Sequence, residues 1–132
     1  MWLTLVNNNI AVSSIYKEII PSLKGIFIHE FNFITGPVFS ILLKFDLSEL
    51  PIDIPAEWNE TDYNTVQLQM EFYEIKLDTF DLNPSNYKNG HLLIENLFDH
   101  KLITYIDSAG SLVFRFTCSE IFVKSLSGYL NK

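Results

Sequence analysis

Apolar and polar side chains alternate along most of this chain, and a period of two is typical of β-strands that bury one face. The alternation is clearest in 39–47 and 64–73, where every second residue is apolar. In 25–34 it places Phe27, His29, Phe31 and Phe33 on one face. The pattern predicts strands at 25–34, 39–47, 64–80, 91–97, 101–107 and 112–118, and a last strand or short helix at 120–127 that Gly128 ends.

One segment near the N-terminus departs from this alternation. Apolar residues at Ile10, Ile15 and Ile19 fit the spacing of a helix face, and an asparagine before them is a favourable N-cap. Pro21 closes the pattern, because the residue before a proline avoids the helical conformation. We therefore predict one short helix at about 9–20.

Turn residues, and one change of phase in the apolar alternation, predict how the strands are connected. Gly36-Pro37 and Asn89-Gly90 are turn signals, and each predicts a hairpin. Within 64–80 the apolar positions change phase near Tyr73 and Glu74, which predicts a β-bulge there.

Together these elements predict an α+β fold. It has one N-terminal helix plus a curved antiparallel meander sheet of six or seven strands. A chain of 132 residues is the size of one domain, so we expect 1–132 to form a single domain.

The negative charge of the chain is concentrated in residues 46–81. This segment has ten acidic residues against one lysine, whereas the whole chain has a net charge of −7. Its part from 48 to 63 contains two prolines and no apolar period, so we predict a long loop. The ten acidic residues are Asp46, Glu49, Asp53, Glu57, Glu60, Asp62, Glu71, Glu74, Asp78 and Asp81.

Composition argues against several functions. With one arginine and scattered lysines the chain has no basic patch for a phosphate backbone, so we expect no direct nucleic-acid binding. Cys118 is the only cysteine, which excludes an internal disulfide. No signal peptide or membrane span is evident, so we expect a cytoplasmic protein without a membrane partner.

Motifs for metal binding and catalysis are also missing from the sequence. The three histidines, His29, His91 and His100, follow no metal-site spacing, and Cys118 occupies an apolar strand position. We therefore expect no metal, no cofactor and no catalytic residue. One enzymatic or small-ligand alternative remains, a pocket near the bulge at 73–74 that uses Glu71, Glu74 and His29.

Several short motifs follow one another along nearly the whole chain, with none in 81–110. They are Trp2, Ile15-Tyr16, Pro21-Ser22-Leu23, Phe45-Asp46-Leu47, Pro51, Pro55, Trp58, the run Tyr63 to Leu68, Cys118, and Ser127 to Leu130. In this order and spacing the motifs resemble the bacterial immunity 50 family of polymorphic toxin systems. The resemblance implies a non-enzymatic antidote that binds a co-encoded toxin domain and blocks it.

Combined with the charge, the resemblance suggests a basic toxin, such as a nuclease, that meets an acidic surface. Acidic residues would steer the partner, and Tyr63 and Trp58 would anchor it. One alternative is a solubilising surface with Trp58 over the core; another is a homo-oligomer formed through an exposed strand edge. We expect a monomer or weak homodimer. The predicted partner-binding residues are Asp46, Glu49, Asp53, Glu57, Trp58, Glu60, Asp62, Tyr63, Glu71 and Glu74.

Overall fold

A computed structural model describes residues 1–52, 63–81 and 87–130. It confirms the α+β class, with an N-terminal helix and an antiparallel sheet, but the sheet has eight strands instead of six or seven. The elements are η1 (Trp2–Leu5), α1 (Ile10–Tyr16), β1 (Lys24–Ile34), β2 (Ser40–Leu47), β3 (Thr65–Tyr73), β4 (Lys76–Phe80), β5 (Gly90–Asn96), β6 (Lys101–Ile106), β7 (Leu112–Cys118) and β8 (Glu120–Tyr129).

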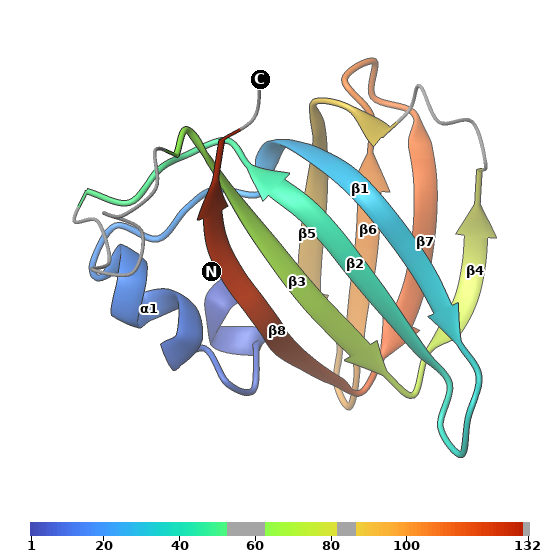
Figure 1. Ribbon diagram of the computed structural model, residues 1–132. Helices are drawn as coiled ribbons and strands as arrows, with labels where there is room; N and C mark the ends of the chain where they lie inside the picture. Colours follow the sequence, from blue (N-terminus) through green and yellow to red (C-terminus); the bar gives the residue numbers. More distant parts are fainter. Residues whose placement is uncertain (53–62, 82–86, 131–132) are drawn as a thin grey trace.

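The sheet folds into two layers. Its strand order is β4-β7-β6-β5-β1-β2-β3-β8, and Figure 1 shows β1, β2, β3 and β8 in front of β5, β6, β7 and β4. The layers are joined where the start of β1 pairs with β5, through Lys24 opposite His91 and Ile26 opposite Gly90. The pairing ends at Ile26, because its partner Gly90 is the first residue of β5, and from Phe27 on β1 pairs only with β2 in the front layer.

The second connection between the layers lies at residues 73–76, where a single bulged strand was predicted. That prediction is wrong, because β3 pairs with β8 without interruption from Met70 to Tyr73, which lies opposite Glu120, and the irregularity of this ladder lies earlier, between Gln69 and Met70. The chain then turns at Glu74, which has a φ of 56°, and begins β4 in the back layer. This passage from one end of the sheet to the other adds a strand and breaks the predicted meander.

Aromatic side chains from both layers fill the space between them. Phe45 and Phe72 from the front layer and Phe114 and Phe116 from the back layer are 0% exposed. The rings of Phe72 and Phe116 meet edge-on at 5.2 Å. Burying aromatic surface of this size is a main stabilising term of the fold and explains the apolar period of the strands.

The helix is shorter than predicted and faces the core differently. It ends at Tyr16, because Lys17 has a φ of 60°, and it buries Val12 and Tyr16 while Ile10 stays 73% exposed. Asn9 makes no side-chain capping bond. None of the described helices is long and apolar enough to cross a membrane.

The asparagines before the helix cover part of a strand edge. The side chain of Asn8 accepts from the backbone N–H of Val123 at 2.7 Å and donates to its carbonyl at 2.9 Å. The side-chain oxygen of Asn7 accepts from the N–H of Ile121 at 3.2 Å, and the backbone N–H of Asn7 donates to the carbonyl of Ile121 at 2.8 Å. These bonds satisfy peptide groups of the edge strand β8 that would otherwise be open to another strand.

Two turn predictions are also corrected. Gly128 does not end the last element, because it lies inside β8 and pairs with Val66. Asn89-Gly90 does not join a hairpin, because β5 pairs with β6 and β1 while β4 pairs with β7. Gly90 instead lies under the ring of Tyr105, so its missing side chain serves packing.

Candidate functional site

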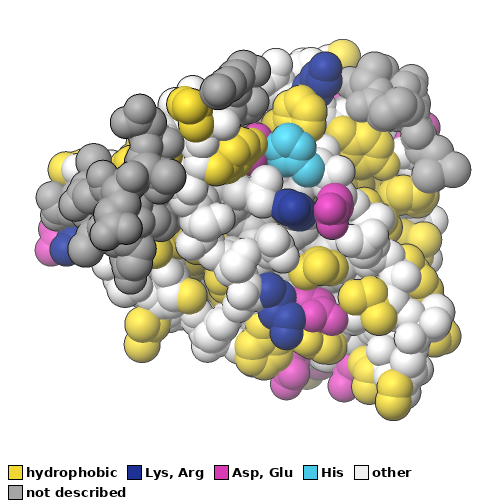
Figure 2. Space-filling model, viewed as in Figure 1, with side chains coloured by type: hydrophobic (Ala, Val, Ile, Leu, Met, Phe, Trp, Pro, Cys, Tyr) yellow, Lys and Arg dark blue, Asp and Glu magenta, His cyan; other side chains and the backbone are white. Residues whose placement is uncertain are grey.

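The outward side of the front layer carries a band of polar side chains, which we call the polar face. On β3 the buried positions alternate with half-buried Gln67, Gln69, Glu71 and Tyr73, which point to this side. Figure 2 looks onto this face and shows a histidine and several paired basic and acidic groups across it. The face combines charge, hydrogen-bonding groups and aromatic rings, as protein-binding surfaces do.

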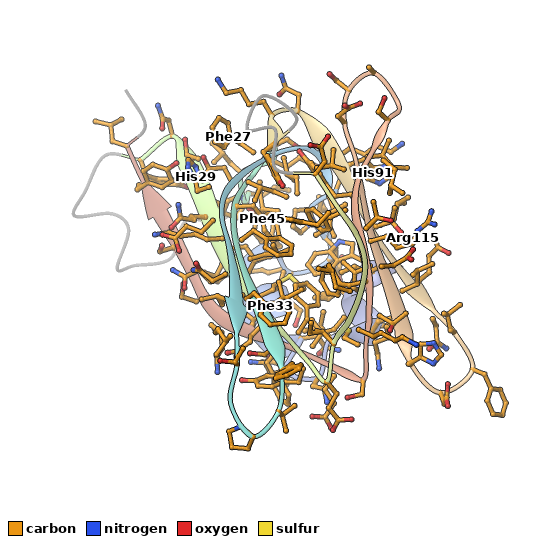
Figure 3. The ribbon with its side chains drawn as sticks, turned by 90° about the vertical axis from the view of Figure 1, so that its right-hand side faces the viewer. Phe27, His29, Phe33, Phe45, His91 and Arg115 are labelled. Atoms are coloured by element: carbon orange, nitrogen blue, oxygen red, sulfur yellow. The ribbon has the colours of Figure 1, made fainter. Side chains whose placement is uncertain are left out.

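A bulge in β1 places His29 on the polar face. In the pairing of β1 with β2, Ile28 lies opposite Phe45 and Glu30 opposite Lys44, so His29 is the extra residue. The bulge reverses the phase of the strand, and Phe31 therefore points into the core while Phe27 and His29 point outward. The expectation that these residues share a face with Phe31 and Phe33 is wrong. Figure 3 shows Phe27 and His29 close together near one end of β1, with their rings stacked at 4.5 Å.

Beneath His29 lies the carboxylate of Asp46 from β2. Its Oδ2 is 2.6 Å from His29 Nε2 and also accepts a hydrogen bond of 2.6 Å from the hydroxyl of Tyr129 on β8. The carboxylate is 9% exposed, and its Oδ1 is buried with no hydrogen-bond partner. A buried carboxylate is costly unless hydrogen-bond donors reach it. The hydrogen bonds to Asp46 therefore hold the side chains of His29 and Tyr129 in position.

The hydroxyl of Tyr129 keeps its proton under ordinary conditions. Burial, the hydrogen bond to Asp46 and the negative charge of that carboxylate together raise the pKa of Tyr129 to about 12. Through these hydrogen bonds the three side chains join β1, β2 and β8 across the face.

A second polar cluster lies farther along the same face. Glu71 on β3 accepts a hydrogen bond of 2.8 Å from the hydroxyl of Ser40, and Lys124 Nζ lies 3.4 Å from its carboxylate. Lys124 also donates to the hydroxyl of Tyr73 at 3.2 Å. Burial alone would raise the pKa of Glu71, but hydrogen bonds from Ser40, Tyr73 and Lys124 outweigh it and lower that pKa below 4.5.

The charges on this face are therefore mostly paired. Besides Glu71 with Lys124, Glu30 lies 3.8 Å from Lys44 between the two clusters. Within the described residues, no group of three or more His, Cys, Asp or Glu side chains is arranged to hold a metal ion. What the arrangement offers chemically is recognition, through fixed donors, acceptors and rings.

A comparison with protein-family models decides the family. The model described as immunity protein 50 matches residues 8–129, which is most of the chain. The chain belongs to the immunity protein 50 family. No curated protein and no solved structure matches it. Immunity protein families are generally non-enzymatic and imply binding to a cognate toxin protein.

Of the predicted acidic residues within 1–52 and 63–81, two lie on the polar face. Asp46 and Glu71 both lie on the polar face, yet both are bonded internally and neither is a freely exposed charge. Asp46 in particular was expected to act as an exposed steering group, but it is 7% exposed.

Other predicted residues lie elsewhere. The carboxylate of Glu49 accepts from the backbone N–H of Ser22 at 2.8 Å, and its carbonyl accepts from Tyr16, so Glu49 joins the segment after β2 to the helix region. Tyr63 is half-buried and packs on the core. Glu74 lies in the turn between β3 and β4. The remaining five, Asp53, Glu57, Trp58, Glu60 and Asp62, lie outside the described residues.

The described part of the acidic segment 46–81 is thus divided between the two layers. Asp78 lies on β4 in the back layer, where its carboxylate is 3.9 Å from Arg115, far along the sheet from Asp46 on β2. The six acids described do not form one continuous patch, because the chain changes layers at Glu74.

The pocket expected near 73–74 finds no support in the described cavities. The three described cavities are not lined by Glu71, Tyr73 or Glu74. His29 instead lines a cavity of about 380 Å³ together with Phe27, Glu30 and Lys88. His29 and Glu71 belong to separate clusters, so the side chains of the predicted catalytic or ligand site do not converge.

Sequence reasoning missed Tyr129, Ser40 and Lys124, and it missed the pairing of His29 with Asp46. One signal was present for the histidine. The apolar positions of 25–34 change phase between Ile28 and Phe31, which is the argument used for a bulge at 73–74. Tyr129 had no such signal, because its partner is 83 residues away in the chain.

Proposed function

We propose that this chain binds a cognate toxin domain and neutralises it in the cytoplasm of the cell that makes both. The observation that carries the proposal is the immunity protein 50 match over residues 8–129. A protein of this kind needs a preformed surface on a rigid scaffold, since ordering a surface during binding costs affinity. The polar face on four paired strands meets this requirement.

We further propose that the toxin domain is basic, as many nucleic-acid-cleaving toxins are. The chain has a net charge of −7, and ten of its acids lie in residues 46–81. Opposite charge on the partner would raise the association rate more than the final affinity. In this proposal Asp46 and Glu71 hold the polar face in shape, and Trp58 and Tyr63 anchor the toxin. The acidic residues that steer it are Glu49, Asp53, Glu57, Glu60, Asp62 and Glu74. We expect the chain to act as a monomer or weak homodimer.

The first test is protection. The toxin domain encoded beside this chain is expressed in cells with and without it, and growth is followed. Growth restored by the chain, together with a stable complex of the two purified proteins, supports the proposal. A complex that does not form, with growth arrested in both cultures, contradicts it.

The charge part is tested by association kinetics. The double variant E57K/E60K is compared with E95K/D99K, which changes the net charge equally at the end of β5 and in the turn that follows it. If 46–81 steers the toxin, E57K/E60K should slow association roughly tenfold at low salt and little at high salt. The association rate of the control variant E95K/D99K should fall much less. Equal slowing of association by both variants would mean that net charge alone sets the rate, and it would contradict a steering site within 46–81.

A further inference from the structure

The hairpin between β1 and β2 ends in an exposed apolar tip. Phe33 and Ile34 at the end of β1 are 46% and 39% exposed, and Val38 and Phe39 before β2 are 45% and 52% exposed. We call these four residues the hairpin tip. The ring centroids of Phe33 and Phe39 lie 5.7 Å apart, with the ring planes tilted by 51°. Figure 1 shows the hairpin reaching beyond the other strands, and Figure 2 shows hydrophobic side chains at that corner.

The sequence on both sides of the hairpin tip also lacks charged residues. No charged residue occurs from Phe31 to Leu43, in a chain of which 19% is charged. Its form is held from both sides, by the ladder of Ile34 with Ser40 and by the backbone N–H of Ile75, which donates to the carbonyl of Phe39 at 3.3 Å. The exposed rings therefore belong to an ordered element, and apolar clusters of this kind mark interaction sites.

We propose that the hairpin tip inserts into an apolar pocket of the toxin domain and supplies the salt-independent part of the binding energy. The proposal rests on the function proposed above. Buried aromatic anchors at the centre of an interface carry most of its energy, and a rigid hairpin presents them at little entropic cost.

Shape and charge favour a toxin domain as the partner of the hairpin tip, over a second copy of this chain or a lipid surface. A second copy would have to meet the tip through the same surface in a two-fold dimer, and two projecting tips bury little of each other. An anionic lipid surface would repel a chain of net charge −7. Concave apolar pockets that accept such a tip are common on enzymes, and a toxin domain is the partner that the family implies.

The test measures the dissociation constant between the full chain and the purified toxin domain at low and high salt. The variant F33T/F39T removes both rings and introduces threonine, a β-branched residue that suits a strand. The matched control is F98T, because Phe98 is fully exposed in the turn between β5 and β6. We expect F33T/F39T to weaken binding at least thirtyfold at both salt concentrations, the size of a strong hot spot, and F98T to bind as wild type.

The outcomes separate the two proposals. Wild-type chain that fails to bind the toxin overturns the proposed function and this inference together. Wild-type binding that F33T/F39T leaves unchanged overturns the hairpin tip alone. A wild-type dimer that F33T/F39T dissociates, with toxin affinity unchanged, also overturns it in favour of self-association. Should F33T/F39T unfold, V38D decides the question, since a carboxylate at the tip must weaken insertion to a similar degree.

Discussion

Replacing Gly90 by alanine should destabilise the junction between the two layers. Gly90 is the first residue of β5 and pairs with Ile26, just before β1 reaches Phe27 and His29. Its φ is not in the left-handed region, so a side chain is acceptable for the backbone. The obstacle is Tyr105, whose hydroxyl accepts a hydrogen bond of 3.1 Å from the N–H of Gly90.

The magnitude follows from the distances. A Cβ at position 90 would lie 2.2 Å from Cζ and 2.3 Å from the hydroxyl oxygen of Tyr105, well inside the 3.4 Å at which ordinary contact begins. The ring cannot swing away, because Tyr105 is 0% exposed and stacks between Tyr87 and Phe114. Overpacking costs about 1–3 kcal/mol, and the lost hydrogen bond about 1 kcal/mol more. We expect a loss of about 3 kcal/mol, a large share of the roughly 5–15 kcal/mol of a typical domain.

Urea unfolding followed by circular dichroism measures this loss as a lower midpoint, by about 1.5 M at a slope of about 2 kcal/mol/M. Gly36→Ala is the control, because a Cβ there meets nothing closer than the carbonyl oxygen of Val38 at 3.9 Å. That variant should unfold at or slightly above the wild-type midpoint, since alanine restricts the unfolded chain. A Gly90→Ala midpoint within about 0.3 M of wild type would refute the packing of Tyr105 over Gly90, at the same slope of about 2 kcal/mol/M.

Two further predictions concern the polar face. Tyr129→Phe removes one of the two donors of the buried Asp46 carboxylate and should cost about 1–2 kcal/mol in urea unfolding; an unchanged midpoint would mean that Tyr129 does not support Asp46. Glu71→Gln should be less stable than wild type at pH 7, because the bonds from Ser40 and Lys124 favour the carboxylate and lower its pKa. A lowered pKa stabilises the fold above the unfolded value of 4.5 and loses that effect as pH falls through the folded value, so the gap between the two proteins should close below about pH 4.5. A gap that stays constant between pH 7 and pH 3 would contradict the assignment.

The local pattern of the sequence determined the class of the fold. Alternation identified β2, the first half of the 64–80 segment and β7 nearly to the residue, because each strand buries one face and the pleat has a period of two. The order of short motifs also indicated the family, which the match over 8–129 confirms. These are signals that a chain carries within a few residues of each position.

The tertiary structure decided what depends on partners far apart in the chain. After the turn at Glu74 the chain enters the other layer, where β4 (Lys76–Phe80) pairs with β7 and does not continue β3. The asparagines at 7 and 8, expected near a helix cap, instead bind the edge of β8 more than a hundred residues away.

The candidate site shows the same division. The acidic residues of 46–81 were visible as a run, but alternation and the change of layer distribute them over different faces. The carboxylate of Asp46 is contacted by His29, displaced by a bulge, and by Tyr129, on the last strand. A run of charges is a property of sequence alone, whereas the burial of one charge depends on which distant strands pair beside it, and pairing is settled by the packing of the whole core.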